Sequence, residues 1–375
     1  MNRIILIGNG FDLAHGLKTS YNDFIDWILR TKYDLIKNNH GDVTDNDITH
    51  PNTIYSYYDK PYEDFRENFY NNSGIIGYKN NFLELIIRSR YINGWADIEM
   101  MFYDELNNLL DNTNTTNKEI DKFNSDFQRI IDLLEEYLLI VVKNKSDTNT
   151  NILGRINNLL ESNVKEYQLS IEFKNNNNPL SYKTNNQGEE IFNIGEKDVN
   201  KCLIIDFNYT QTIYPYLIDK RTRKLKDKFI HVNIHGELKQ DDNQMIFGFG
   251  DELDENYIKI EKSRIDGVLK YIKSINYLKT DNYRNVLNFL ELDKFQVFIW
   301  GHSCGLTDRT LLNHIFEHEK CAGIMPYYHK RFNEETKEYS NNYIEIVSNI
   351  VRNFTDKNKL RDRVVNFQYC EPLIK

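Results

Sequence analysis

Short apolar runs alternate with amphipathic segments at both ends of the chain. Residues 4–8 read Ile-Ile-Leu-Ile-Gly, a β-branched run that is apolar on both faces, as is typical of a buried strand in a parallel sheet. Thr19 and Ser20 are N-cap candidates for a helix that follows. The apolar positions of that helix share one face: Tyr21, Phe24, Ile25, Ile28 and Leu29. The opening of the chain therefore predicts a strand, a turn and a helix.

Strand-like runs return after residue 200. They lie at 202–207, 229–234, 245–249, 297–300, 323–328 and 364–369. Helical patterns separate several of them, at 209–219, 265–291, 307–318 and 341–353. Strands that alternate with helices predict an α/β fold with a Rossmann-like, mainly parallel sheet flanked by helices.

The stretch from 38 to 195 has a different character. It is rich in Asn and poor in Gly, with helical patterns at 79–92, 97–110 and 118–143. Polar stretches such as the four asparagines at 175–178 interrupt these patterns, and we interpret them as surface loops. We therefore expect a nucleotide-binding core at 1–37 and 196–375, interrupted by a mostly helical insertion at 38–195.

Net charge and cysteine content argue against several classes of function. The 375 residues include 47 Lys and Arg against 56 Asp and Glu, a net charge of −9. This balance argues against broad nucleic-acid binding, which needs a cationic surface. Four cysteines without a C-x-x-C pair do not form a zinc ribbon, so we expect no metal. No apolar stretch approaches the roughly 18 residues of a membrane helix, and the N-terminal run is too short for a signal peptide. We expect a cytoplasmic protein with reduced thiols.

The first turn is a candidate phosphate site. Gly8, Asn9, Gly10, Phe11 and Asp12 follow the first predicted strand. Glycines at this place let backbone N–H groups approach a pyrophosphate at the start of the next helix. The third glycine of the G-x-G-x-x-G pattern is absent, since leucine stands at position 13. A plain tight turn is therefore an equal alternative.

Two further strand ends carry candidate catalytic groups. Asn208 follows the run at 202–207, at a carboxyl end of the sheet, although it could simply cap a helix. His235 and Gly236 follow the run at 229–234. A neutral imidazole is a frequent general base, whereas a single histidine is also often structural.

The fourth strand end reads Gly-His-Ser-Cys-Gly-Leu-Thr-Asp over residues 301–308. It matches G-x-S-x-G, the nucleophile elbow of serine hydrolases, in the expected strand–turn–helix context. The downstream acids and histidines are too close in sequence for separate strand ends to supply a triad. We therefore favour a nucleotide site here, in which Gly301 allows close packing and Ser303 and Asp308 face ribose oxygens.

Two acids lie near a predicted helix start in the insertion. Asp97 and Glu99 are two residues apart, which is not the spacing of one helical face. We interpret them as first-turn acids that complement the helix dipole. The alternative is that they reach the crevice of the sheet.

Together, the motifs GNGFD, DFNYT, IHG and GHSxGxxD, in this order, resemble the AbiH family of bacteriophage abortive-infection proteins. The stretch ILIGNGFDLAHGLKTSYNDF is the most specific part. More widely, the chain is similar to sirtuin-like NAD-binding proteins. This resemblance implies that Asn208 orients the nicotinamide ribose or a water and that His235 is the catalytic histidine. Residues 8–12 would cradle the phosphates, and Gly301, Ser303 and Asp308 would line the adenosine side.

The resemblance implies an NAD-consuming defence enzyme that cleaves the nicotinamide–ribose bond. A nucleotide-binding sensor without turnover is the alternative, and a Ser303 hydrolase is the less favoured one. The cysteines cannot supply the zinc module of sirtuin deacylases, so we do not expect protein deacylation. The expected partners are a small-molecule nucleotide, a phage-derived trigger and a second copy of the chain.

Overall fold

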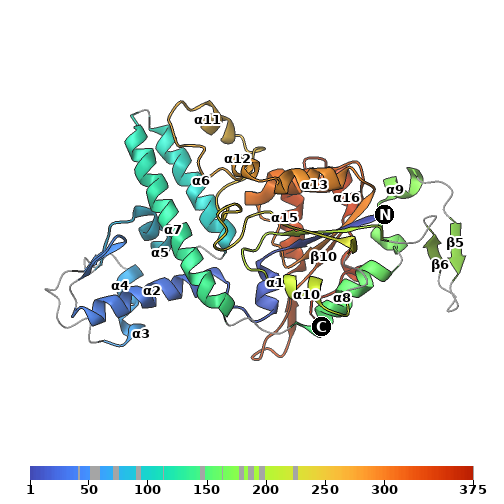
Figure 1. Cartoon of the computed structure of the whole chain (residues 1–375), viewed down its shortest axis with the longest axis horizontal. Coiled ribbons are helices and arrows are strands. Elements are labelled where there is room, and N and C mark those ends of the chain that lie inside the picture. The colour runs from blue at the N-terminus through green and yellow to red at the C-terminus, as the bar shows by residue number, and fades with distance from the viewer. Residues whose placement is uncertain are drawn as a thin grey trace.

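The computed structural model describes residues 1–40, 43–50, 60–70, 76–89, 94–112, 114–143, 148–162, 164–176, 181–184, 190–193, 199–222 and 227–374. Their centre is a five-stranded sheet in which every neighbouring pair is parallel (Figure 1). Across the sheet the strands are β10 (Cys321–Tyr327), β9 (Phe295–Trp300), β1 (Asn2–Ile7), β7 (Cys202–Asp206) and β8 (Phe229–Asn233). The α/β, Rossmann-like fold expected from the sequence is confirmed.

The strand order places a crevice beside β1. The chain runs from β1 outward through β7 to β8, then returns to the other side of β1 for β9 and β10. In the register of the sheet, Ile7 lies level with Asp206 on one side and Trp300 on the other. The turns that follow these three strands therefore leave the same edge of the sheet. In open parallel sheets, ligands bind where the strand order reverses in this way.

Both faces of the sheet are covered by helices, which explains why the strands are apolar on both sides. Ile4 and Leu6 point to one face, and Ile5 and Ile7 to the other. The first face packs on α13 (Asn282–Leu290), α14 (Arg309–Glu317) and α15 (Tyr343–Asn353). The second packs on α1 (Asn9–Ala14), α8 (Thr150–Glu161) and α10 (Tyr214–Ile218).

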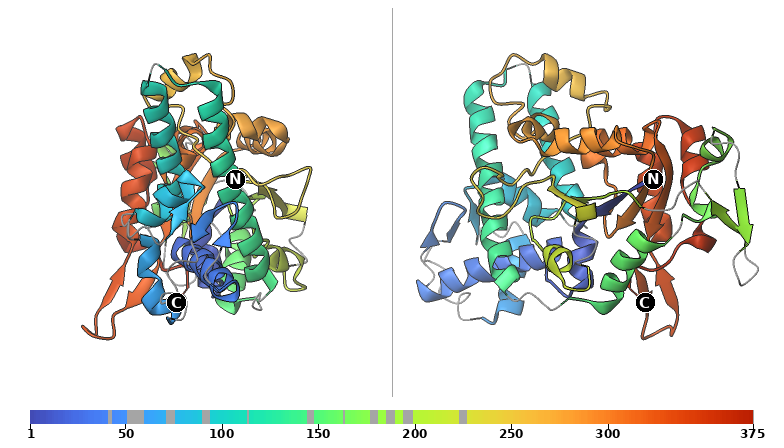
Figure 2. Two further views of the ribbon diagram at one scale, coloured as in Figure 1. Left: turned by 90° about the vertical axis from the view of Figure 1, so that its left-hand side faces the viewer. Right: turned by 45° about the vertical axis from the view of Figure 1, so that its right-hand side comes forward.

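A helical lobe lies beside the sheet. Its main helices are α2 (Tyr21–Asn38), α5 (Asn81–Arg88), α6 (Trp95–Asp111) and α7 (Asn117–Lys143). Figure 2 shows α6 and α7 running side by side. Phe102 and Phe127 stack between them with ring centroids 4.1 Å apart, and Phe82 packs edge-on against Phe127. This aromatic core is separate from the two clusters on the sheet.

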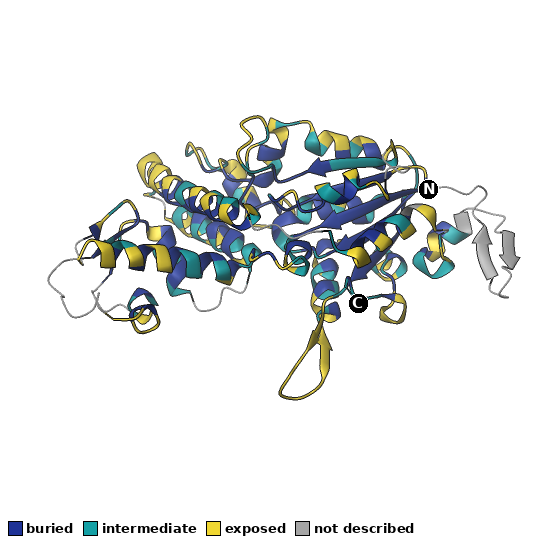
Figure 3. Cartoon of the chain, turned by 60° about the horizontal axis from the view of Figure 1, so that its bottom comes forward, coloured by how far each residue is buried: buried dark blue, intermediate teal, exposed yellow. Residues whose placement is uncertain are grey.

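Smaller elements complete the described chain. In the lobe they are β2 (Val43–Thr44), β3 (Ile48–His50), α3 (Tyr62–Phe65), α4 (Glu67–Tyr70) and β4 (Gly77–Tyr78). Elsewhere they are η1 (Glu166–Gln168), α9 (Ile171–Asn176), β5 (Ser181–Thr184), β6 (Glu190–Asn193), α11 (Tyr257–Lys262), α12 (Lys273–Asn276), η3 (Tyr277–Lys279), η4 (Leu306–Asp308), β11 (Lys330–Phe332), β12 (Tyr339–Asn341), α16 (Lys357–Arg363) and η5 (Phe367–Tyr369). The hairpin of β11 and β12 is exposed and stands away from the body (Figure 3). Across the described ranges, no helix combines the length and apolarity needed to cross a membrane.

Most expected elements are found, but two expected strands are wrong. The run at 245–249 forms a single bridge, between Phe249 and Ile272. Its phenylalanines pack into the core of the helical lobe, and Gly248 lies against the backbone of Tyr271. Ile246 packs in the cluster on the sheet, but the segment does not pair as a strand. The run at 364–369 makes one bridge to β10, through Val364, and then forms η5.

Two expected helices are also interrupted. The pattern at 209–219 becomes the short α10, which begins only at Tyr214 and has a proline in its first turn. The pattern at 265–291 becomes α12 and the contiguous η3, followed by α13 after a bend at residues 280–281. By contrast, Ser20 caps α2 as expected, accepting a hydrogen bond from the Asp23 backbone N–H.

The domain boundaries expected at 37/38 and 195/196 stay a prediction. Helix α2, expected in the core, buries its apolar face in the helical lobe. Helix α8, expected in the insertion, covers the sheet through Ile152 and Ile156. Each helix thus packs with the elements that its apolar face contacts. Of the expected loop at 175–178, residues 177 and 178 lie outside the described residues.

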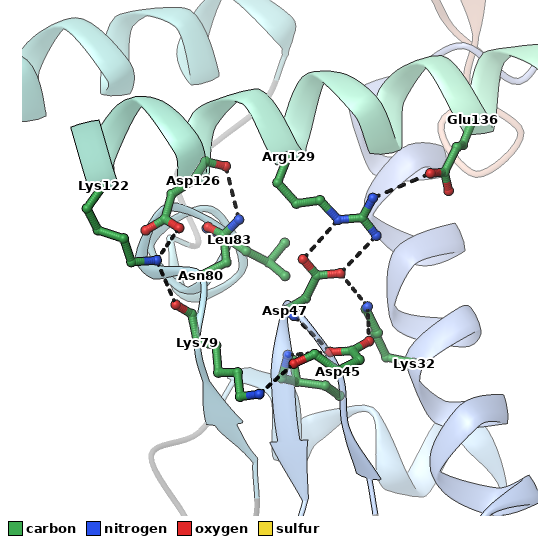
Figure 4. Close-up of polar contacts among 11 residues, drawn as sticks. Lys32, Asp45, Asp47, Lys79, Asn80, Leu83, Lys122, Asp126, Arg129 and Glu136 are labelled. Carbon is green, nitrogen blue, oxygen red and sulfur yellow. Dashed lines mark hydrogen bonds and ion pairs between the residues drawn. The ribbon is translucent and has the colours of Figure 1, made fainter. Parts of the chain in front are cut away.

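A buried ion network holds the lobe together (Figure 4). Lys32 Nζ lies 2.5 Å from a carboxylate oxygen of Asp45 and 2.5 Å from one of Asp47. Arg129 on α7 donates two hydrogen bonds to Asp47, from Nε at 3.1 Å and from Nη2 at 3.2 Å. Asp47 is fully buried, so its charge depends on these two cations.

Removing this charge should destabilise the protein. In Asp47→Asn, Arg129 loses its buried carboxylate and Lys32 retains only Asp45. We expect a loss of about 3–5 kcal/mol in the free energy of unfolding, the cost of breaking a buried ion pair. Chemical denaturation measures it. The control is Asp132→Asn on the exposed face of α7, for which we expect a change within about 0.5 kcal/mol. Equal stability of the two variants would contradict this role of Asp47.

Candidate functional site

Two glycine turns meet backbone to backbone at the crevice. Gly10 N–H donates to the carbonyl of Gly301 at 2.8 Å. A Cβ on Gly301 would lie 2.2 Å from the Phe11 nitrogen, and one on Gly10 would lie 2.8 Å from Gly301 Cα. Gly301 also has a φ of +71°, which disfavours other residues. Both glycines are thus required for the turns after β1 and β9 to touch.

The contact between the two turns occupies backbone N–H groups that the sequence analysis assigned to phosphate binding. The N–H groups of Gly8, Gly10 and Phe11 bind the carbonyls of Trp300, Gly301 and Gly8, in that order. They would contribute nothing to a phosphate cradle while these bonds persist. Asp12 is buried on α1 and accepts a hydrogen bond from the Thr210 hydroxyl at 2.5 Å. The phosphate site at residues 8–12 therefore stays a prediction.

Asn208 joins the turn after β7 to the first turn. Its backbone N–H donates to Asp206 Oδ1 at 2.9 Å, and its side-chain Nδ2 donates to the Gly8 carbonyl at 3.1 Å. Asn208 does not cap a helix, because α10 begins only at Tyr214. The side chain is buried at the carboxyl edge of the sheet, where the sequence placed it.

His235 and Asp308 come together from different strand ends. His235 follows β8, and Asp308 ends η4 after β9. His235 Nε2 lies 3.0 Å from Asp308 Oδ1 and 3.3 Å from the Tyr277 hydroxyl. Both residues of the pair are buried. The sequence assigned Asp308 to the adenosine side, whereas the structure places its carboxylate on the imidazole.

Two charged residues that sequence reasoning missed or misjudged complete the cluster. Lys273 Nζ lies 2.8 Å from Asp308 Oδ1 and 2.8 Å from Glu99 Oε1, and its side chain is 1% exposed. No motif marks Lys273, which falls within the helix expected at 265–291. Glu99 was expected to face the helix dipole, but it reaches the crevice from α6. Asp97 behaves as expected of a first-turn acid, accepting a hydrogen bond from Gly94 N–H at 2.9 Å.

His302 packs on the other side of Asp308. Its Nδ1 accepts a hydrogen bond from Cys304 N–H at 3.0 Å, which leaves Nε2 to carry a proton. That nitrogen faces Asp308 Oδ2 at 3.5 Å. The ring of Phe207 contacts both histidines, with ring centroids 5.1 Å from His235 and 4.0 Å from His302. Phe207 directly precedes Asn208, so its ring joins the two histidines to the turn of Asn208.

Burial and neighbouring charges shift the pKa of four side chains in this cluster. Burial, and then the charge of Lys273, lower the pKa of His235 to about 4. Burial opposes ionisation of Asp308, but Lys273 and His235 outweigh it and hold the pKa of Asp308 well below its ordinary value. Burial raises the pKa of Glu99 to about 7 against the opposing effect of Lys273. For Lys273, the two carboxylates outweigh burial and raise the pKa.

These charges define what His235 can do at neutral pH. The ring is neutral, and its Nε2 proton is held by ionised Asp308. The lone pair is then on Nδ1, which makes no hydrogen bond within the described chain. A neutral imidazole oriented by a carboxylate is the arrangement of a general base.

The geometry gives no support to a serine hydrolase. Ser303 is exposed, and within the described residues no histidine contacts its hydroxyl. Among residues 302–304 the positive φ is at Cys304 (φ +56°), one residue after Ser303, so Ser303 does not occupy the tip of a nucleophile elbow. Over the same described ranges, no group of three or more His, Cys, Asp or Glu side chains is arranged to hold a metal ion.

The contact between the glycine turns can be tested with a matched pair of variants. Gly301→Ala and Gly16→Ala both place alanine at a positive φ, but a Cβ at Gly16 meets nothing within 4 Å. We expect each to lose about 1–2 kcal/mol to backbone strain. Gly301→Ala should lose about 1–3 kcal/mol more, because its Cβ drives the turns apart. Thermal and chemical unfolding measure the difference, and equal losses would contradict the requirement for close contact.

Comparison with known proteins assigns the family. No curated protein and no solved structure matches the chain. The family model described as "Bacteriophage abortive infection AbiH" matches residues 4–329, which include all four strand ends of the site. Abortive infection is a form of antiviral defence, and the chain functions in that setting. On this match the chain belongs to the AbiH family.

Proposed function

We propose that this chain is an NAD-cleaving enzyme of phage defence, with His235 as its general base. The observation that carries the proposal is the buried pair of His235 and Asp308, with Nε2 and Oδ1 3.0 Å apart. It lies at the carboxyl edge of a parallel sheet, beside the place where the strand order reverses. Nucleotides bind at this place in other sheets of this topology.

The proposed reaction is hydrolysis of the bond between nicotinamide and ribose. The bond breaks with its electron pair leaving on nicotinamide, and the ribose carbon passes through an oxocarbenium-like state. Water adds to that carbon, and its proton passes to Nδ1 of His235. The products are nicotinamide, ADP-ribose and a proton. The steps need a base, a fixed water and an oriented sugar, which side chains can supply.

Asn208 is the proposed orienting group. Its Nδ2 is held by the Gly8 carbonyl, so the direction of the amide plane is fixed by the first turn. Its Oδ1 makes no hydrogen bond within the described chain and is the atom available to a ribose hydroxyl or to water. The Asn208 amide thus couples the turn after β1 to the substrate.

Deep burial favours a second candidate, a nucleotide-binding sensor without turnover. His235, Asp308 and Asn208 are each less than one-tenth exposed. Binding of a ligand to side chains so little exposed would change the structure around them, and a sensor could use that change as its signal. The two candidates differ in whether bound NAD is cleaved.

The first test is chromatographic measurement of nicotinamide and ADP-ribose after incubation of the protein with NAD. We expect the wild type to form both products. His235→Ala should lower the rate by about 10²- to 10⁴-fold, the usual contribution of a general base. Asn208→Ala should also lower it, through loss of orientation. The control is His314→Ala, an exposed histidine on α14, which should keep the wild-type rate.

Two results would count against the enzyme. Wild-type turnover in His235→Ala would remove the proposed base. NAD that binds but stays intact, as measured by calorimetry beside the product assay, would favour the sensor.

A further inference from the structure

The proposed chemistry uses His235, Asp308 and Asn208 but leaves a buried cation unexplained. Lys273 is almost completely buried, and its ammonium group contacts two carboxylates. A buried ion pair of this kind seldom adds net stability, because desolvation of the charges offsets their attraction. Its value to the protein then lies in what the charge does to its neighbours.

Lys273 and His235 share one oxygen atom. Nζ of Lys273 lies 2.8 Å and Nε2 of His235 lies 3.0 Å from Oδ1 of Asp308. The two nitrogens are therefore within about 6 Å of each other, the range over which like charges strongly disfavour one another. If His235 took up a proton, two cations would face each other across a single buried oxygen.

We propose that Lys273 is a positioning residue that keeps His235 neutral, and that Glu99 gives the helical lobe control over Lys273. The inference rests on the proposed function, since it concerns the same base. It adds that α6, which belongs to the lobe, contributes to the site.

The groups around His235 leave Lys273 as the decisive charge. Asp308 alone would favour the protonated ring. Tyr277 faces Nε2 and Tyr209 packs near the ring, but burial raises the pKa of both phenols well above the ordinary value, so they stay neutral. His302 faces the other oxygen of Asp308. Among these neighbours Lys273 is the charge that most strongly opposes protonation of His235, and His302 opposes it to a smaller extent.

Glu99, on α6, connects the ammonium group of Lys273 to the helical lobe. Its carboxylate contacts Lys273 Nζ at 2.8 Å from Oε1 and 2.9 Å from Oε2, and Oε1 also accepts from Gly248 N–H at 3.3 Å. Glu99 partly neutralises Lys273 and so weakens its effect on His235. A movement of α6 that withdrew Glu99 would strengthen the electrostatic opposition of Lys273 to protonation of His235.

The titration of His235 tests the proposal without substrate. Histidine-labelled protein would be followed by NMR against pH, with His235→Gln identifying the resonance. In Lys273→Met the pKa of His235 should rise from about 4 by about 1–3 units, the usual effect of a nearby charge. Lys273→Arg keeps the positive charge, so His235 should stay neutral down to the wild-type range.

Two further variants distinguish an effect of charge on the His235 titration from an effect of misfolding. Lys273→Met with Glu99→Gln removes the lysine together with its second carboxyl partner, which is protonated at the pH where His235 titrates, since its pKa is about 7. The rise in the pKa of His235 should persist. Glu99→Gln alone should leave the pKa of His235 at or below the wild-type value. The matched control is Lys32→Met, which removes another buried lysine that also bridges two carboxylates but lies in the network of Figure 4. It should not move the titration.

The outcomes separate the two proposals. An unchanged His235 titration in the folded double variant would overturn the role of Lys273. A rise in Glu99→Gln as large as in Lys273→Met would overturn it too, since loosened packing rather than charge would then be the cause. Absence of NAD cleavage in the wild type, with the predicted titration shifts present, would reject the enzyme but keep the charge relation.

Discussion

The arrangement of the whole site depends on one carboxylate oxygen, Oδ1 of Asp308. It receives the imidazole that follows β8 and the ammonium group of α12, while Asp308 itself follows β9. Through Lys273 the same oxygen is connected to α6 in the helical lobe. A single buried acceptor therefore ties together segments that are far apart in the sequence. Because these charged groups are buried, they cannot readily exchange their partners in the cluster for water.

The sheet was largely predictable, since a parallel sheet buried on both faces leaves a direct trace in the sequence. The apolar runs that became β1, β7, β8, β9 and β10 were all found, and helices on both faces explain them. The apolar run at 245–249 misled for a physical reason. Apolar residues buried against helices give the same short pattern as apolar residues buried in a sheet, and only tertiary packing distinguishes the two.

The site was predictable where residues follow strands and unpredictable where they do not. Asn208, His235 and Asp308 were found because parallel strands bring their carboxyl ends to one edge. Lys273 was missed because a lysine in an amphipathic pattern is normally on the solvent face. Glu99 could be proposed for the crevice only as an alternative, since its partner lies 174 positions away in the chain. The hydrogen bonds that Gly8 and Gly10 N–H donate to the carbonyls of Trp300 and Gly301 were equally hidden. A glycine pattern does not reveal whether a ligand or another backbone approaches it.

The position of Glu99 also bears on how this architecture can be altered. The helical lobe has its own aromatic core and ion network, so it could be regarded as an exchangeable module. One of its side chains, however, balances a lysine that the rest of the chain provides. A hybrid in which another lobe replaced this one would need an acid at the same point of contact, or Lys273 would be left with Asp308 alone. The two parts of the molecule can therefore be redesigned only as a pair.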